Sequence, residues 1–368
     1  MRVGLTALAT AVLGCFPAVA QQYGSALAGA LTDSTTAALF ASQELLTLTI
    51  DAPLETIFHE RGQKSTEYAG VLSYENPRGE SVDIPVDLRT RGKTRLQASV
   101  CEFPPLRLDF STNDVDGTIF ASQDKLKLVT HCQDNRSEHE QYVLQEYLIY
   151  RSYNVLTDVS FKVRLARVTY IDTDRERDTL TRYAFLIEDE EQLAARNGWG
   201  VVRVPRIPPD AIDPLQLSLL EIFQYMIGNT DWSAFMKEQD RLECCHNTKP
   251  IGDAATGPVF PVPYDFDITG VVSTRYAHRL FRENLDRMDL PSVRERLYKG
   301  RCASQPYLEH TFRVFNEKRD EIYGLYRDQE GLEADILEKS LEYLDEFYEI
   351  INDPVKVRRE ISRNCRRI

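Results

Sequence analysis

The chain has 368 residues, of which 42% are hydrophobic and 27% charged, and its formal net charge is −13. This composition is that of a globular protein, and the acidic balance argues against nucleic acid or an anionic membrane as the main partner. A chain of this length is longer than a single hydrophobic core usually supports, so we expect two lobes or domains.

The first twenty residues have the pattern of a cleavable export signal. Arg2 precedes an apolar stretch that ends in the small-residue cleavage site Ala18-Val19-Ala20. An alternative is a lipoprotein site, in which the protein would be anchored through acylated Cys15. We therefore expect an exported protein, periplasmic or extracellular, with a loosely ordered leader over residues 21–42. No later stretch is apolar enough to predict a transmembrane segment.

Six cysteines lie beyond the predicted signal, at positions 101, 132, 244, 245, 302 and 365. In an exported chain they favour one or more disulfide bonds, although the sequence alone does not choose among the pairings. The first candidate is Cys101 with Cys132, because each lies at the edge of a predicted strand in the same lobe.

Residues 43–190 have the pattern of a β-rich N-terminal lobe. Alternating or β-branched apolar residues, separated by turn residues, predict antiparallel strands at 46–50, 68–74, 82–91, 106–110, 126–130, 159–171 and 182–187. Between the fifth and sixth of these, apolar residues from Val143 to Tyr150 recur at helical spacing. Ser137 and Glu140 have the form of a capping box at the start of that helix.

A hinge-like loop over residues 191–212 leads into a helical C-terminal lobe, residues 213–368. Asp213 and Pro214 predict a helix start, and Gly228 predicts its end. Leucines and aromatic residues at spacings of three and four predict a packed helix in the tail. The order of elements predicts an α+β fold similar to that of protein kinases: a strand-rich N-terminal lobe with one long helix, and a mainly helical C-terminal lobe.

Phosphoryl transfer requires a cation on the phosphates, a carboxylate near the attacking hydroxyl and oxygen ligands for Mg²⁺. Lys125 and Lys127 alternate with leucines, so both lie on one face of a strand and either could reach phosphates. Lys127 is the catalytic candidate. Glu146, on the following helix, is the carboxylate expected to orient it, since Glu140 is assigned to the capping box.

The helical half supplies candidate oxygen ligands. Asp231 follows the predicted helix end in the loop Gly-Asn-Thr-Asp-Trp, where it could align an acceptor hydroxyl. Asn247 offers an amide oxygen, and Asp265 and Asp267 offer carboxylates within the stretch VPYDFDITG. Oxygen ligands of this kind suit Mg²⁺ or Mn²⁺. Asp265 is the primary candidate and Asp267 the auxiliary one.

At these residues the sequence resembles the CotH-type family of atypical, secretory-pathway-like kinases, over roughly residues 45–275. The shared features are the Arg91-Gly92 strand, a lysine-bearing strand before a helix, the G-N-x-D loop, a later asparagine and an aromatic-Asp-aromatic-Asp run. The resemblance implies binding of ATP and a divalent metal ion. It also implies the catalytic-loop role for Asp231, and metal ligation by Asn247 and Asp265.

Two features depart from the kinase pattern. Asp231 and Asn247 are far apart for a catalytic loop, so Asn229 is an alternative metal ligand. A glycine-rich phosphate loop is also missing from the first half of the sequence. The alternating cations Arg89, Arg91, Lys93 and Arg95 could replace it as an anion clamp, or could simply form a solvated strand face.

The sequence therefore predicts an exported kinase-like protein that binds Mg-ATP or a related nucleotide and transfers phosphate to a protein or small acceptor. Lys125 and Arg91 are its further candidate nucleotide-binding residues. One alternative is a catalytically silent protein of the cell envelope on the same scaffold. Another is a hydrolase that uses Asp231 and Asp265 as an acid and base pair. The pattern does not specify the acceptor or an oligomeric state.

Overall fold

A computed structural model describes residues 36–62, 66–237, 242–253, 255 and 257–367. The chain from Ala37 onward forms one compact unit. The predicted export signal, the alternative anchor at Cys15 and the leader up to residue 35 lie outside the described residues. The end of the predicted leader forms a short helix, α1 (Ala38–Ala41), whose Leu39 and Phe40 are buried in the core.

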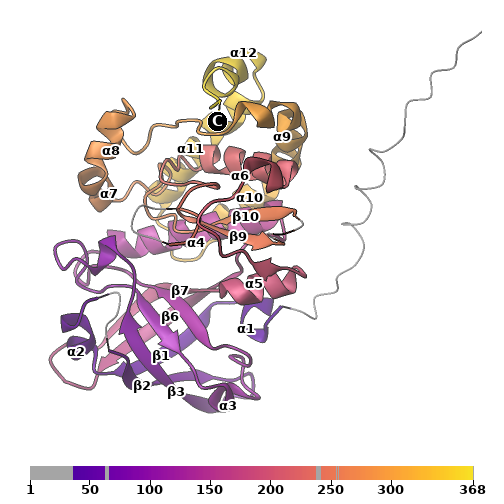
Figure 1. The fold of residues 1–368 in the computed structure, drawn as a ribbon. Coiled ribbons are helices and arrows are strands. Elements are labelled where there is room, and N and C mark those ends of the chain that lie inside the picture. Colours follow the sequence, from indigo (N-terminus) through magenta and orange to yellow (C-terminus); the bar gives the residue numbers. More distant parts are fainter. Residues whose placement is uncertain (1–35, 63–65, 238–241, 254, 256, 368) are drawn as a thin grey trace, which may run out of the picture. The chain divides into compact units, whose positions relative to one another are not determined.

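The first half of this unit is a closed barrel of seven strands (Figure 1). The strands are β1 (Leu46–Ala52), β2 (Tyr68–Glu75), β3 (Ser81–Thr90), β4 (Leu106–Asp109), β5 (Lys125–Val129), β6 (Val163–Asp172) and β7 (Leu180–Ile187). Around the barrel they follow the order β1-β2-β3-β4-β5-β7-β6. All neighbours are antiparallel except β1 and β6, which pair in parallel and close the barrel.

The barrel encloses one hydrophobic core. Burial alternates along its strands, so that Leu48, Ile50, Leu72, Leu126 and Leu128 point inward and are fully buried. Two short helices, α2 (Leu54–His59) and α3 (Thr112–Val115), and a 3₁₀ turn at Thr94–Leu96 lie in its connections. The predicted strand positions are confirmed to within a few residues, although β6 begins at Val163 and not at residue 159. Alternation is a local signal that survives in the folded chain.

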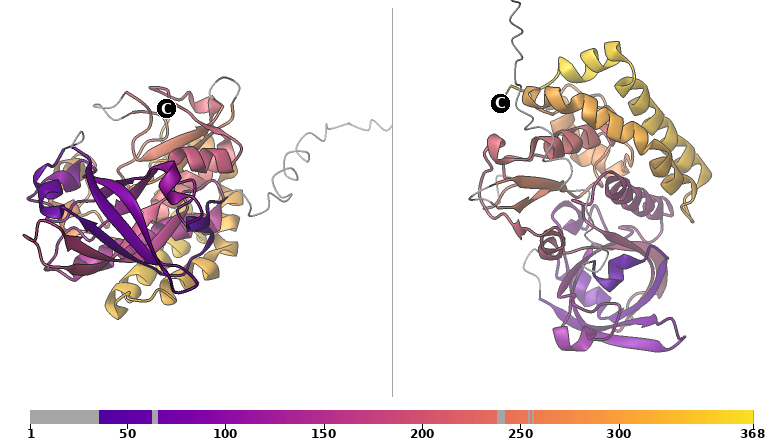
Figure 2. Two further views of the ribbon diagram at one scale, coloured as in Figure 1. Left: turned by 90° about the horizontal axis from the view of Figure 1, so that it is seen from below. Right: turned by 90° about the vertical axis from the view of Figure 1, so that its right-hand side faces the viewer.

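Helix α4 (Glu138–Leu156) separates the barrel from the helices of the second half, as Figure 1 and the right-hand view of Figure 2 both show. It is buried on both sides and contacts β6, β7 and α10 (Arg319–Arg327). The predicted capping box at its start is wrong. Ser137 makes no capping hydrogen bond, and the Glu140 carboxylate accepts the backbone N–H of Tyr183 on β7 at 2.9 Å instead. Glu140 therefore ties the helix to the barrel.

The second half combines helices with a small sheet. The sheet has the order β10-β9-β8, with β8 (Gly200–Val201), β9 (Thr248–Gly252) and β10 (Val259–Pro263). The other helices are α5 (Glu190–Arg196), α6 (Pro214–Met226), α7 (Arg275–Leu280), α8 (Arg282–Arg287), α9 (Leu308–Glu317), α11 (Ala334–Ile351) and α12 (Pro354–Val357), with 3₁₀ turns at Pro209–Ala211 and Cys302–Tyr307 and a π-helical turn at Arg358–Ser362.

Helix α6 begins and ends where the sequence predicts. The Asp213 carboxylate accepts the backbone N–H of Gln216 at 2.8 Å, and Pro214 occupies the first turn. Gly228 follows the helix with φ of +67°, and a side chain there would collide with the Tyr343 hydroxyl. The predicted tail helix is confirmed as α11.

The prediction of a two-lobed protein-kinase-like fold is wrong. The strands close into a mixed seven-stranded barrel, and the second half contains a separate three-stranded sheet in addition to its helices. The parallel pairing of β1 with β6 joins Leu46 to Ala166, a contact between distant segments that leaves no local pattern. Strand β8 has only two residues, too few for a periodic signal.

Three disulfide bonds link Cys101 to Cys132, Cys244 to Cys245, and Cys302 to Cys365. The predicted pairing of Cys101 with Cys132 is confirmed. Disulfides of this number are typical of proteins that fold in an oxidising compartment. Within the part of the chain that the structure describes, no helix is both long and apolar enough to cross a membrane.

Candidate functional site

A cluster of three cations forms where the barrel meets β9 and β10. Lys127, on β5, places its Nζ atom 5.3 Å from the centre of the Tyr264 ring, and the Nζ atom of Lys249 lies 5.8 Å from the same ring. Arg91 follows β3 nearby. Burial, together with the charges of Arg91 and Lys249, lowers the pKa of Lys127 to about 8. Among the described residues, Lys127 has no carboxylate within ion-pair distance.

Lys125 lies apart from this cluster. Burial alternates along β5, so the prediction that Lys125 and Lys127 share one face of the strand is confirmed. Lys127 is paired across the sheet with Arg107, however, whereas Lys125 is paired with Asp109. The Lys125 side chain is 42% exposed and forms an ion pair with Asp124 at 3.6 Å. We therefore exclude it from the candidate site.

Arg95 connects three carboxylates at the centre of the junction. Its guanidinium lies 3.3 Å from Asp267, 3.7 Å from Glu146 and 3.7 Å from Asp265. Although burial lowers the pKa of Arg95, the carboxylates of Asp267 and Glu146 raise it well above its ordinary value. The predicted pairing of Glu146 with Lys127 is therefore wrong, because Glu146 faces Arg95. The sequence placed Arg95 in a run of alternating cations but did not reveal this role.

The two aspartates of VPYDFDITG have different environments. Asp267 is buried, and besides its ion pair with Arg95 it accepts a hydrogen bond from the Tyr276 hydroxyl at 2.9 Å. The Asp265 side chain is 41% exposed, and its backbone N–H donates to the Tyr150 hydroxyl at 2.9 Å. Asp265 is therefore the better placed of the two to bind a cation.

Asn247 lies beside Asp265 because β9 and β10 form a hairpin. Thr248 pairs with Pro263, and next to this pair the backbone N–H of Tyr264 donates to the Asn247 carbonyl at 3.2 Å. The side-chain amide of Asn247 donates to the backbone carbonyl of Asp231 at 2.7 Å, which leaves its amide oxygen available for a cation.

The alternative ligand Asn229 is less suitable. Its side-chain oxygen already accepts the backbone N–H of Asp231 at 2.8 Å, and the residue is buried. Of the two asparagines, Asn247 is therefore the better candidate.

Asp231 is held in place by two neighbours. One carboxylate oxygen lies 2.8 Å from Nε2 of His246, and the other accepts a hydrogen bond from the Asn247 amide at 3.2 Å. The Asp231 side chain is 24% exposed, so part of the carboxylate can meet a ligand. The pairing of Asp231 with His246 was not predicted from the sequence. The only available signal was the position of His246 directly before Asn247.

The oxygen atoms of this site are too few to coordinate a metal ion without ligands from elsewhere. Among the described residues, no group of three His, Cys, Asp or Glu side chains could hold a metal ion alone. Asp265 and Asn247 nevertheless present two oxygen atoms of the kind that bind Mg²⁺. Protein sites for Mg²⁺ commonly contribute only one or two carboxylates, and the phosphates of the substrate and water complete the coordination.

Comparison of the chain with known protein families and with curated proteins gives no match.

Proposed function

We propose that this protein binds a nucleoside triphosphate, ATP or a related nucleotide, together with Mg²⁺ or Mn²⁺, and transfers a phosphoryl group to an acceptor hydroxyl. The observation that carries the proposal is the cation cluster of Arg91, Lys127 and Lys249. Of these three cations, Lys249 alone has a close carboxylate partner among the described residues, Glu190 at 2.7 Å. Burial, together with the charges of Arg91 and Lys249, lowers the pKa of Lys127. A polyphosphate anion would relieve this repulsion with charge-assisted hydrogen bonds.

The residues around the cluster have complementary roles in this proposal. Lys127 and Arg91 contact the phosphates, and Asp265 and Asn247 hold the metal ion, which when bound neutralises phosphate charge. Asp231 orients the acceptor hydroxyl, and His246 and Asn247 hold its carboxylate in position. Arg95 and Glu146 act indirectly, by fixing the peptide that carries Asp265.

The resemblance to CotH-type kinases and the predicted export signal support the same proposal. The three disulfides are in keeping with export to an oxidising compartment. The acceptor would be a protein or a small molecule rather than nucleic acid, because the chain is strongly acidic.

Thermal unfolding with Mg-ATP and Mn-ATP tests nucleotide binding. We expect both to raise the melting temperature, since ligand at about 100 times its Kd contributes about 2.7 kcal/mol. Lys127→Met and Asp265→Asn should reduce the increase, whereas the matched control Lys125→Met, on the same face of the same strand, should retain it. Absence of any increase in the parent protein refutes the proposal.

Two further measurements separate the parts of the proposal. An equal increase with ATP in the presence of a chelator would refute the role of the metal ion. Release of ADP in the presence of candidate acceptors then tests turnover. Binding without ADP release would identify the catalytically silent alternative, a nucleotide-binding protein of the cell envelope.

A further inference from the structure

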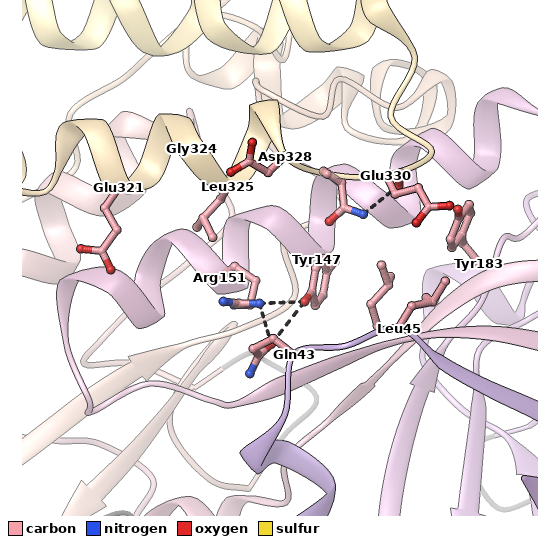
Figure 3. Close-up of a pocket in the computed structure, with 12 residues that line it drawn as sticks. Gln43, Leu45, Tyr147, Arg151, Tyr183, Glu321, Gly324, Leu325, Asp328 and Glu330 are labelled. Atoms are coloured by element: carbon pink, nitrogen blue, oxygen red, sulfur yellow. Dashed lines mark hydrogen bonds between the residues drawn. The ribbon is translucent and has the colours of Figure 1, made fainter. Parts of the chain in front are cut away.

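A second candidate site lies between α4 and α10, at a cavity of about 520 Å³ (Figure 3). Its size is within the range of small-molecule sites in proteins. Tyr147 and Arg151, one turn apart on α4, form one wall, and Glu321, Leu325 and Asp328 lie along α10 and its end on the other. None of these residues belongs to the cation cluster, so the site is separate from that of the proposed function.

The walls of this cavity are held in fixed positions. The side chain of Gln141, on α4, donates to the carbonyl of Gly331 at 3.0 Å and accepts the backbone N–H of Glu333 at 2.9 Å. These bonds attach the loop after α10 directly to α4. Seven residues of helix rise about 10 Å, so the wall from Glu321 to Asp328 extends over about this length.

Two polar side chains in the cavity lack partners that match their chemistry. Arg151 bonds only to neutral groups, the Gln43 side chain at 2.5 Å and the Tyr147 hydroxyl at 2.9 Å, and it has no carboxylate partner among the described residues. Tyr183 is only 7% exposed, and its hydroxyl has no hydrogen-bond partner in the described part of the chain. Figure 3 shows Arg151 grouped with Gln43 and Tyr147, and Tyr183 beside Glu330.

The other residues that line the cavity contribute apolar surface and negative charge. Leu45, Leu165 and Leu325 supply apolar surface. The carboxylates of Asp328 and Glu330 also line the cavity and form no ion pair within the described ranges. A complementary ligand therefore carries an anionic group, apolar side chains and a cationic group.

We infer that this cavity binds a short apolar peptide with free ends, about three residues long. An extended peptide rises about 3.3 Å per residue, so three residues match the length of about 10 Å. The peptide carboxylate would bind Arg151, its apolar side chains would contact Leu165 and Leu325, and its amino group would lie near Asp328 and Glu330. The Tyr183 hydroxyl would hydrogen-bond to the peptide backbone.

Isothermal titration calorimetry with the tripeptide Ala-Leu-Ala tests this inference. We expect saturable binding with one peptide per chain. The N-acetylated and the C-amidated peptides should each bind about tenfold more weakly or worse, because each loses a charge-assisted interaction. Failure of Ala-Leu-Ala to bind at concentrations up to about 10 mM, or equal binding of all three peptides, overturns the inference.

Variants assign the two ends of the peptide. Arg151→Met should weaken Ala-Leu-Ala about tenfold and remove the difference between the free and amidated peptides. Glu330→Gln, an exposed loop change, should instead reduce the difference between the free and acetylated peptides. The matched control Arg327→Met, on α10 but outside the cavity, should bind like the parent. Parent-like binding by both cavity variants would also overturn the inference.

Discussion

Lys127→Met should make the free protein more stable while weakening its binding of Mg-ATP. In the folded protein, burial and the charges of Arg91 and Lys249 lower the pKa of Lys127 from 10.5 to about 8. Folding therefore disfavours the protonated lysine. The Lys127 ammonium lies 5.8 Å from the centre of the Phe161 ring and 5.3 Å from that of Tyr264. Methionine fills similar space beside these rings without carrying a charge.

The size of the effect follows from the pKa. A tenfold change in a protonation constant corresponds to about 1.4 kcal/mol, so the lowered pKa of Lys127 represents at most about 3.4 kcal/mol. Partial exposure of the side chain reduces this to about 2 kcal/mol through solvent screening. Loss of the contacts between the Lys127 ammonium and the two rings removes about 1 kcal/mol of stabilisation. The net expected gain is about 1 kcal/mol at pH 7.

The pH dependence has a definite sign. The cost of the buried charge is full below about pH 8, where Lys127 is protonated in both states, and it shrinks as the pH rises towards 10.5. The advantage of Lys127→Met should therefore disappear near pH 10.5. Urea unfolding of the variant and the parent at pH 7 and pH 10.5 measures this difference.

Lys125→Met provides the matched control for this experiment. Lys125 is 42% exposed and paired with Asp124, so its replacement should not stabilise the protein. A Lys127→Met protein that is less stable than the parent at pH 7, or a gain that persists unchanged at pH 10.5, would refute the reasoning. A variant that is stabilised but no longer responds to Mg-ATP would separate the binding role of Lys127 from a structural one.

Two further substitutions test the buried charges. Arg95→Met should lower the free energy of unfolding in urea by about 3–5 kcal/mol, because it leaves Asp267 and Glu146 buried without their cation. The control Arg89→Met removes a more exposed ion pair and should lower it by less than about 1 kcal/mol. Equal costs would show that Arg95 does not compensate buried charge. Burial raises the pKa of Glu221 from 4.5 to about 7. Ionisation of this buried carboxylate therefore does not reduce stability below pH 4.5, and it reduces stability fully above about pH 7. Glu221→Gln should therefore gain stability relative to the parent between pH 5 and pH 8, and a constant difference across that range would contradict this assignment.

The local pattern of the sequence determined where most of the barrel strands and several helices lie. Alternating burial of the leucines in β5 and the capping of α6 by Asp213 depend on residues close together in the chain. Such signals act within one element, so they can be read without knowing the fold. The pairing of Cys101 with Cys132 could also be predicted, because each lies at the edge of a predicted strand in the same lobe.

The tertiary structure alone decided the fold class and the partners within the site. The sequence grouped Lys127, Asp231 and Asp265 as candidates, but assigned Glu146 to Lys127 and overlooked His246. Glu146 on α4 faces Arg95, which lies in the 3₁₀ turn after β3, and the barrel closes because β1 pairs with β6. Both contacts join segments that are far apart in the chain. Their formation depends on how whole elements pack, and no spacing of residues within a single element encodes it.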